Sequence, residues 1–222
     1  MNCLNILPPK NTSTRYMIHQ FRIKYNVIIS RKVGLITMYI PKSKVFSLKI
    51  QMIAGFIFTS AAGFPLHFLY DWTGNRAAAA FSPVNESPWE HLKLIYFPIL
   101  FFLIIQLIYL KQKRTAMPNL IWSTSLSALL AVGAVTAAYY TYSGIIGRNI
   151  MWIDISIFIS AAALAYIFNY RMIKSHPSGI PGSKLAGAAL LLALCALLVV
   201  FTFFTPHIPW FEDPTTGLYG LP

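Results

Sequence analysis

Apolar residues along the chain form five long runs, and short polar segments separate them. The runs cover about residues 50–70, 94–110, 118–142, 151–170 and 185–205. They are nearly free of charge and lack the period-2 alternation of half-buried strands. A bilayer core of roughly 30 Å needs about 20 apolar residues per helix, and backbone groups in lipid must be bonded within the segment. The pattern predicts an all-α integral membrane bundle of five transmembrane helices within residues 48–222.

The composition also favours a membrane protein. Of the 222 residues, 56% are hydrophobic and 11% are charged, whereas soluble domains have about 45–50% apolar and about 25% charged residues. This low charge and high hydrophobicity exclude an intrinsically disordered chain. The two cysteines, Cys3 and Cys195, are too few for a disulfide-stabilised scaffold.

The basic residues lie mainly on one side of the predicted spans. Nine of the 18 precede the first span, three lie within residues 111–114 and three within residues 171–184. Because cytoplasmic segments carry the excess of Lys and Arg, we expect a cytoplasmic N-terminus, an outer C-terminus and a multi-pass location in the cell membrane. This topology and attraction to anionic lipid explain the net charge of +12. Membrane lipids are therefore expected partners, and nucleic acid is not.

Residues 1–47 form a basic leader without acidic residues or a sustained hydrophobic period. Such a segment is typical of a poorly ordered arm, flexible or lying on the membrane surface at the cytoplasmic side. The alternative is that translation starts at Met38 rather than Met1, and the sequence leaves both open.

The acidic residues and most histidines fall at the opposite, outer side of the spans. These residues are Asp71, Glu86, Glu90, Asp154, Glu212 and Asp213, with His67, His91 and His207. His67 and Asp154 should lie about one turn inside the membrane interface, where ionisable groups are costly and usually face a bundle interior or a wet cavity. His67 and Asp71 are four residues apart and would share one helix face. We therefore expect these side chains to gather into one polar site.

The segment between the first two spans separates into structural and chemical parts. Ser87, Pro88 and Glu90 match a capping box with proline at the first helical position, which gives Glu90 a structural role. Glu90 is also spaced to pair with Lys93 across one turn. Asn85 and Glu86 precede the cap and have no such local role, and the ring of His91 is expected to point toward His67.

Three segments resemble an uncharacterised bacterial family of small multi-pass membrane proteins. The similarity lies in residues 67–75, in the Val-Asn-Glu-Ser-x-Trp-Glu-His-Leu-Lys pattern of residues 84–93, and in residues 205–220. It covers about residues 48–222. No activity is assigned to that family, so the resemblance implies only that the three outer segments belong together.

The residues suggest three functions. In a metal-assisted hydrolase of a lipid or envelope substrate, His67, His91, His207 and Asp154 would bind a divalent ion such as zinc. Its catalytic residues would be Glu86 as the general base, His91 and Asp71. The alternatives are a small-solute or ion transporter and a non-enzymatic scaffold or sensor. Small residues in the third and fifth spans would permit close helix packing, either within the chain or against a second copy or another membrane protein.

Overall fold

The computed structural model describes residues 5–6, 28–32, 35–39, 46–176, 180 and 182–221. The chain divides into two compact units, residues 1–45 with 113–115 and residues 46–112 with 116–222. In the first, β1 (Asn5–Ile6), β2 (Ile28–Lys32) and β3 (Leu35–Tyr39) form an antiparallel sheet in the order β1-β3-β2. These strands were not predicted, and the remainder of the predicted leader up to residue 45 lies outside the described residues.

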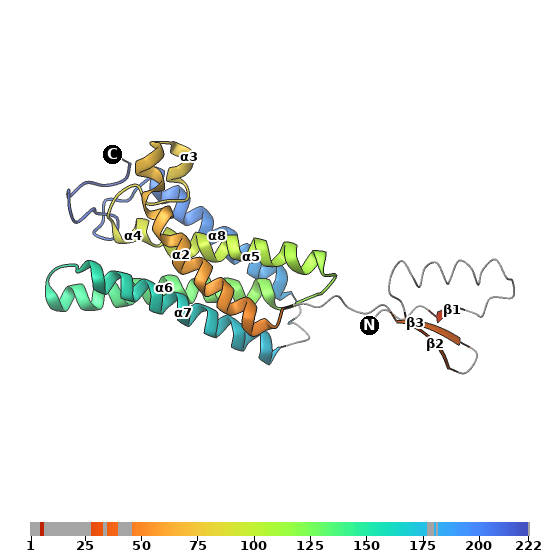
Figure 1. Ribbon diagram of the computed structural model, residues 1–222. Coiled ribbons are helices and arrows are strands. Elements are labelled where there is room, and N and C mark those ends of the chain that lie inside the picture. The colour runs from red at the N-terminus through yellow and green to blue at the C-terminus, as the bar shows by residue number, and fades with distance from the viewer. Residues whose placement is uncertain are drawn as a thin grey trace. The chain divides into compact units, whose positions relative to one another are not determined.

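The second unit is a bundle of helices, as predicted (Figure 1). Its long helices are α2 (Leu48–Thr73), α5 (Lys93–Gln112), α6 (Leu120–Ile146), α7 (Met151–Ser175) and α8 (Ser183–Phe203), and its short helices are α3 (Arg76–Ala79) and α4 (Pro88–His91). All five long helices are long and apolar enough to cross a membrane, with α4 continuing the span of α5. The prediction of an all-α bundle with five candidate spans is confirmed.

The long helices are bounded by residues suited to that purpose. The side chain of Ser47 accepts a hydrogen bond from the Ile50 amide at the start of α2. At its end, Gly74 adopts φ +59° and its amide bonds to the carbonyl of Tyr70, a left-handed termination that glycine adopts without strain. Gly147 ends α6 in the same way, with φ +78°. Pro65 and Pro98 lie inside α2 and α5, which continue through them.

Close helix contacts depend on glycine at two crossings. α2 packs against α5 and α7, and α6 packs against α5, α7 and α8. A Cβ atom at Gly55 of α2 would lie 2.3 Å from the ring of Tyr166, and one at Gly187 of α8 would lie 2.8 Å from the Cα of Trp122 in α6. Packing of this kind is a common source of stability between helices in lipid. The predicted role of small residues in the fifth span holds within the chain at Gly187.

Buried polar side chains join the helices inside the bundle. The Gln106 amide of α5 donates to Gln51 of α2 at 2.7 Å, and Asn169 of α7 donates to Thr124 of α6 at 3.1 Å. None of these side chains is ionisable. α3, α4 and the C-terminal segment, residues 204–221, lie together at one end of the bundle (Figure 1). We call this end, residues 67–93 with 202–221, the polar end.

Candidate metal centre

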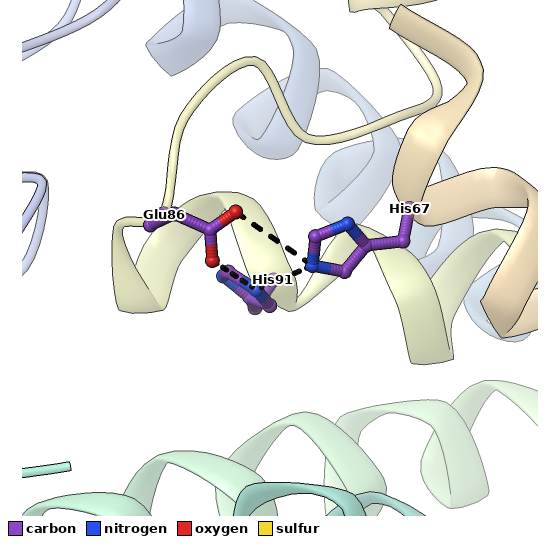
Figure 2. Close-up of side chains that lie close together, drawn as sticks. All are labelled: His67, Glu86 and His91. Atoms are coloured by element: carbon purple, nitrogen blue, oxygen red, sulfur yellow. Dashed lines mark hydrogen bonds and ion pairs between the residues drawn. The ribbon is translucent and has the colours of Figure 1, made fainter. Parts of the chain in front are cut away.

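Three side chains meet at the polar end, and each comes from a different element (Figure 2). His67 lies near the end of α2, Glu86 lies in the loop before α4, and His91 is the last residue of α4. The Nε2 atoms of the two histidines are 3.2 Å apart. The Glu86 carboxylate approaches both, with Oε1 3.8 Å from Nε2 of His67 and Oε2 3.4 Å from Nε2 of His91. Two imidazoles and a carboxylate therefore converge on one point.

The local backbone fixes which ring nitrogen of His91 faces this point. Ser87 caps α4, and its hydroxyl accepts a hydrogen bond from the Glu90 amide at 3.3 Å. The carbonyl of Ser87 lies 2.9 Å from Nδ1 of His91. Because a carbonyl can only accept, Nδ1 carries the proton, and Nε2 of the neutral ring presents its lone pair to the other two side chains.

The two ring nitrogens of His67 have different surroundings. Its Nδ1 atom is buried without a hydrogen-bond partner among the described residues, while its Nε2 atom faces His91. If both rings are neutral, only His67 can supply a proton between the two Nε2 atoms. The lone pair of His91 then also faces the Glu86 carboxylate at 3.4 Å, which places two acceptors against each other. With both rings neutral and Glu86 ionised, no positive charge lies between the three side chains. Either a proton or a metal cation would supply one.

The donor set and spacing fit a divalent metal. A tetrahedral site with ligand distances of about 2.0–2.2 Å separates its ligands by about 3.3–3.5 Å, and the three closest approaches here are 3.2, 3.4 and 3.8 Å. The hydrogen bond from His91 Nδ1 to a carbonyl is the outer-shell contact that metal-binding histidines usually make. When His91 is protonated, its Nε2–H donates a hydrogen bond to Glu86, and this bond lowers the pKa of Glu86 although partial burial acts in the opposite direction, so Glu86 stays ionised.

The loop that carries Glu86 is held by the C-terminal segment. Asn85 accepts a hydrogen bond from the Ser87 amide at 3.0 Å, and its side-chain amide donates to the carbonyl of Gly220 at 2.9 Å. The Trp89 amide donates to the carbonyl of Trp210 at 3.2 Å. The expectation that Asn85 has no local role is therefore wrong. The resemblance implied that the three outer segments belong together, and these contacts join two of them, while the pair of histidines joins the third.

Glu90 makes one of the two contacts that its spacing predicted. Ser87 caps α4 as predicted, but the side chain of Glu90 does not return to the Ser87 amide, which bonds to Asn85 instead. Glu90 pairs with Lys93 at 2.7 Å, as the second reading of its spacing predicted. It also accepts hydrogen bonds from the Val84 amide and the Thr202 hydroxyl. The spacing predicted the pair but not its burial, since the side chain of Lys93 is fully buried.

The remaining predicted site residues lie outside the three-residue group. Asp71 is exposed and makes no hydrogen bond or ion pair with another residue that the structure describes. Asp154 accepts a hydrogen bond from the Tyr142 hydroxyl, which itself accepts one from the Ile150 amide. His207 is exposed, and its ring packs against Tyr219 with the ring centroids 4.8 Å apart. The structure thus brings together His67, His91 and Glu86.

Comparison with known proteins identifies a family without an assigned activity. No curated protein and no solved structure matches the chain. The model of a family of unknown function, DUF6512, matches residues 35–221, which include every helix and all three residues of the group. The chain therefore belongs to this family of unknown function.

Proposed function

We propose that this membrane protein is a metal-dependent hydrolase in which His67, Glu86 and His91 bind one divalent ion of the zinc type. The convergence of two imidazole nitrogens and a carboxylate on one point carries the proposal. Two histidines and a glutamate are an established ligand set of catalytic zinc, with the fourth position left to water. In this proposal Glu86 is a ligand rather than the general base.

Exposure of the group supports catalysis over a closed structural site. The side chains of His67, His91 and Glu86 are 27%, 30% and 49% exposed, so water and a substrate can approach. A metal of this type lowers the pKa of a bound water to about 7 and polarises a carbonyl or phosphoryl oxygen. The group lies where candidate spans α2 and α5 meet the polar loops. We therefore propose a lipid or envelope ester as the substrate class.

The metal is tested before the reaction. Protein purified in detergent and exposed to zinc is expected to retain one ion per chain after desalting, and the double variant His67→Ala/His91→Ala is expected to retain none. His207→Ala is the matched control because His207 is an exposed histidine outside the group. Wild-type protein that retains no zinc, or a double variant that binds it as tightly, contradicts the proposal.

The reaction is tested on mixed micelles containing phospholipids or simple acyl esters. Hydrolysis is expected from the zinc-loaded protein, and it should be lost with EDTA and restored by zinc. A protein that binds the ion but hydrolyses none of these substrates would keep the metal site and contradict the enzymatic part of the proposal.

We further propose that the polar end faces away from the cytoplasm. Fifteen of the 18 basic residues lie before residue 50 or within residues 111–114 and 171–184, which the predicted topology puts on the opposite side of the spans, and this bias supports the orientation. In a background without cysteine, Leu218→Cys should react with a membrane-impermeant maleimide in intact cells, and Arg171→Cys only after lysis. Both positions are exposed, so the reverse pattern would contradict this orientation.

A further inference from the structure

The buried ion pair between Lys93 and Glu90 is formed by residues on either side of His91 in the sequence. The side chains of Lys93 and Glu90 are 0% and 4% exposed. The Lys93 ammonium donates to the Ala79 carbonyl at 2.7 Å, the Ser82 carbonyl at 3.1 Å and Glu90 at 2.7 Å. An ammonium has three protons, and all three are used.

Glu90 extends this network to a second helix and to the loop. Its Oε2 atom also accepts a hydrogen bond from the Val84 amide at 3.1 Å, and its Oε1 atom accepts one from the Thr202 hydroxyl of α8 at 2.9 Å. The pair therefore holds the end of α3 at Ala79 and the following loop at Ser82 and Val84, shortly before Glu86. It also attaches this segment to α8 through Thr202. Breaking the pair would release the loop at three points.

The pair also spans the junction between α4 and α5. α4 ends at His91 and α5 begins at Lys93, so Glu90 and Lys93 lie on either side of the break at Leu92. A four-residue helix has few internal hydrogen bonds that could fix its direction. Since Glu90 and His91 are adjacent on α4, the contacts of the Glu90 side chain hold the backbone from which the His91 ring projects.

We infer that Lys93, acting through Glu90, is a positioning residue for the metal centre; the inference rests on the proposed function. Lys93 contacts neither histidine and would not touch the ion. It keeps Glu86 and His91 at the separation that a metal requires by fixing the loop on one side and α4 on the other. Loss of such outer contacts typically weakens metal binding by about 10–100-fold.

A plain structural role makes a different prediction for the double variant. Replacing a buried ion pair by apolar residues of similar volume is often neutral for stability, whereas removing one partner leaves a buried charge. Glu90→Met/Lys93→Met removes both charges together and so leaves no unpaired buried charge, but the Ala79 and Ser82 carbonyls, the Val84 amide and the Thr202 hydroxyl lose their partners. We expect this variant to fold with lower stability than the wild type. If Lys93 only stabilises the fold, this variant should bind metal normally.

The test is Co²⁺ binding in detergent, followed by the visible absorption of the bound ion and by titration. For Glu90→Met/Lys93→Met we expect an affinity about 10–100-fold below that of the wild type and an altered absorption spectrum. Gln51→Met/Gln106→Met is the matched control, because it removes a buried polar pair from the opposite end of α2 and α5. The control should bind Co²⁺ as the wild type does.

A second variant covers the case in which the double variant does not fold. Thr202→Val keeps the ion pair and the side-chain shape but removes one hydrogen bond to Glu90, and we expect a loss of about three- to tenfold. Wild-type affinity and spectrum in the folded double variant, or in Thr202→Val if only that folds, would overturn the inference and leave the metal site intact. Wild-type protein that binds no Co²⁺ would instead remove the proposed function, and the inference with it.

Discussion

The substitution Glu86→Gln should have opposite effects on the metal-free and the metal-loaded protein. In the metal-free protein at pH 8, the Glu86 carboxylate faces the lone pair on Nε2 of His91 at 3.4 Å. Glutamine has the same shape, removes the negative charge and provides an N–H donor for that lone pair. The metal-free variant is expected to unfold at the wild-type temperature or slightly above it. Because the side chain is 49% exposed, solvent limits the gain to less than about 1 kcal/mol.

Zinc should reverse the order of the two unfolding temperatures, so that the wild type unfolds above Glu86→Gln. At a free concentration of about 100 times its Kd, a ligand stabilises the folded protein by about 2.7 kcal/mol. For a chain of this length, that free energy corresponds to a rise in Tm of roughly 5–10 °C. Replacing Glu86 removes one of the three ligands and the only negative charge among them. The shift is therefore expected to fall below about 2 °C in the variant.

Thermal unfolding in detergent, with EDTA in one sample and zinc in the other, measures both effects. Glu212→Gln is the control, since Glu212 is another acid at the polar end, bonded to the Tyr219 hydroxyl at 2.8 Å, and it should keep the full zinc shift. The reasoning is refuted if Glu86→Gln melts well below the wild type in EDTA and yet retains the wild-type shift with zinc.

Three other predictions follow from the same structure. Zinc affinity should fall as the pH is lowered, because the two histidines take up protons in competition with the metal. Because the pKa of Glu86 is lowered, its carboxylate stays ionised to lower pH than usual and the histidines account for this loss; constant affinity in titrations down to pH 5 would contradict it. Gly187→Ala should lower the free energy of unfolding by about 1–3 kcal/mol, because its Cβ would lie 2.8 Å from the Trp122 backbone. Gly133→Ala, with open space around its Cβ, should be neutral or stabilising. Equal unfolding curves for the two variants would refute this. Asn85→Ala should free the C-terminal segment and speed its proteolysis, and unchanged cleavage rates would show that the bond to Gly220 does not hold it.

The spans could be predicted because their signal is local and repeated over many residues. Any stretch of about 20 apolar residues meets the same constraint in a bilayer, whatever its neighbours. The predicted fifth run, residues 185–205, differs from Ser183–Phe203 by two residues at each end. The strand pairing within residues 1–45 has no comparable local signal, because Ile28–Lys32 contains two basic residues and the segments are short.

The site was only partly predictable because it depends on contacts between distant segments. The approach of His67 and His91 followed from their positions at the facing ends of two consecutive spans, and the structure places them in contact. Asp154 was expected to bind the metal. The prediction did not allow for Tyr142, twelve residues earlier on α6, whose hydroxyl donates a hydrogen bond to the Asp154 carboxylate. Similarly, nothing in the sequence around His207 shows that the chain turns this ring toward Tyr219.

Glu86 in the loop and Glu90 in α4 are four residues apart, and their surroundings show why a cation is expected at one of them. Glu90 is buried, and the chain supplies a lysine and two further donors that satisfy it fully. Glu86 is half-exposed and faces His67 and His91, with no Lys or Arg in contact within the part of the chain that the structure describes. The fold provides Lys93 as an internal cation for Glu90, which is buried. A basic residue is therefore available nearby, and yet none contacts Glu86 within the described part of the chain. An ionised carboxylate and two neutral imidazoles without an internal positive charge form the arrangement that an external divalent ion would complete.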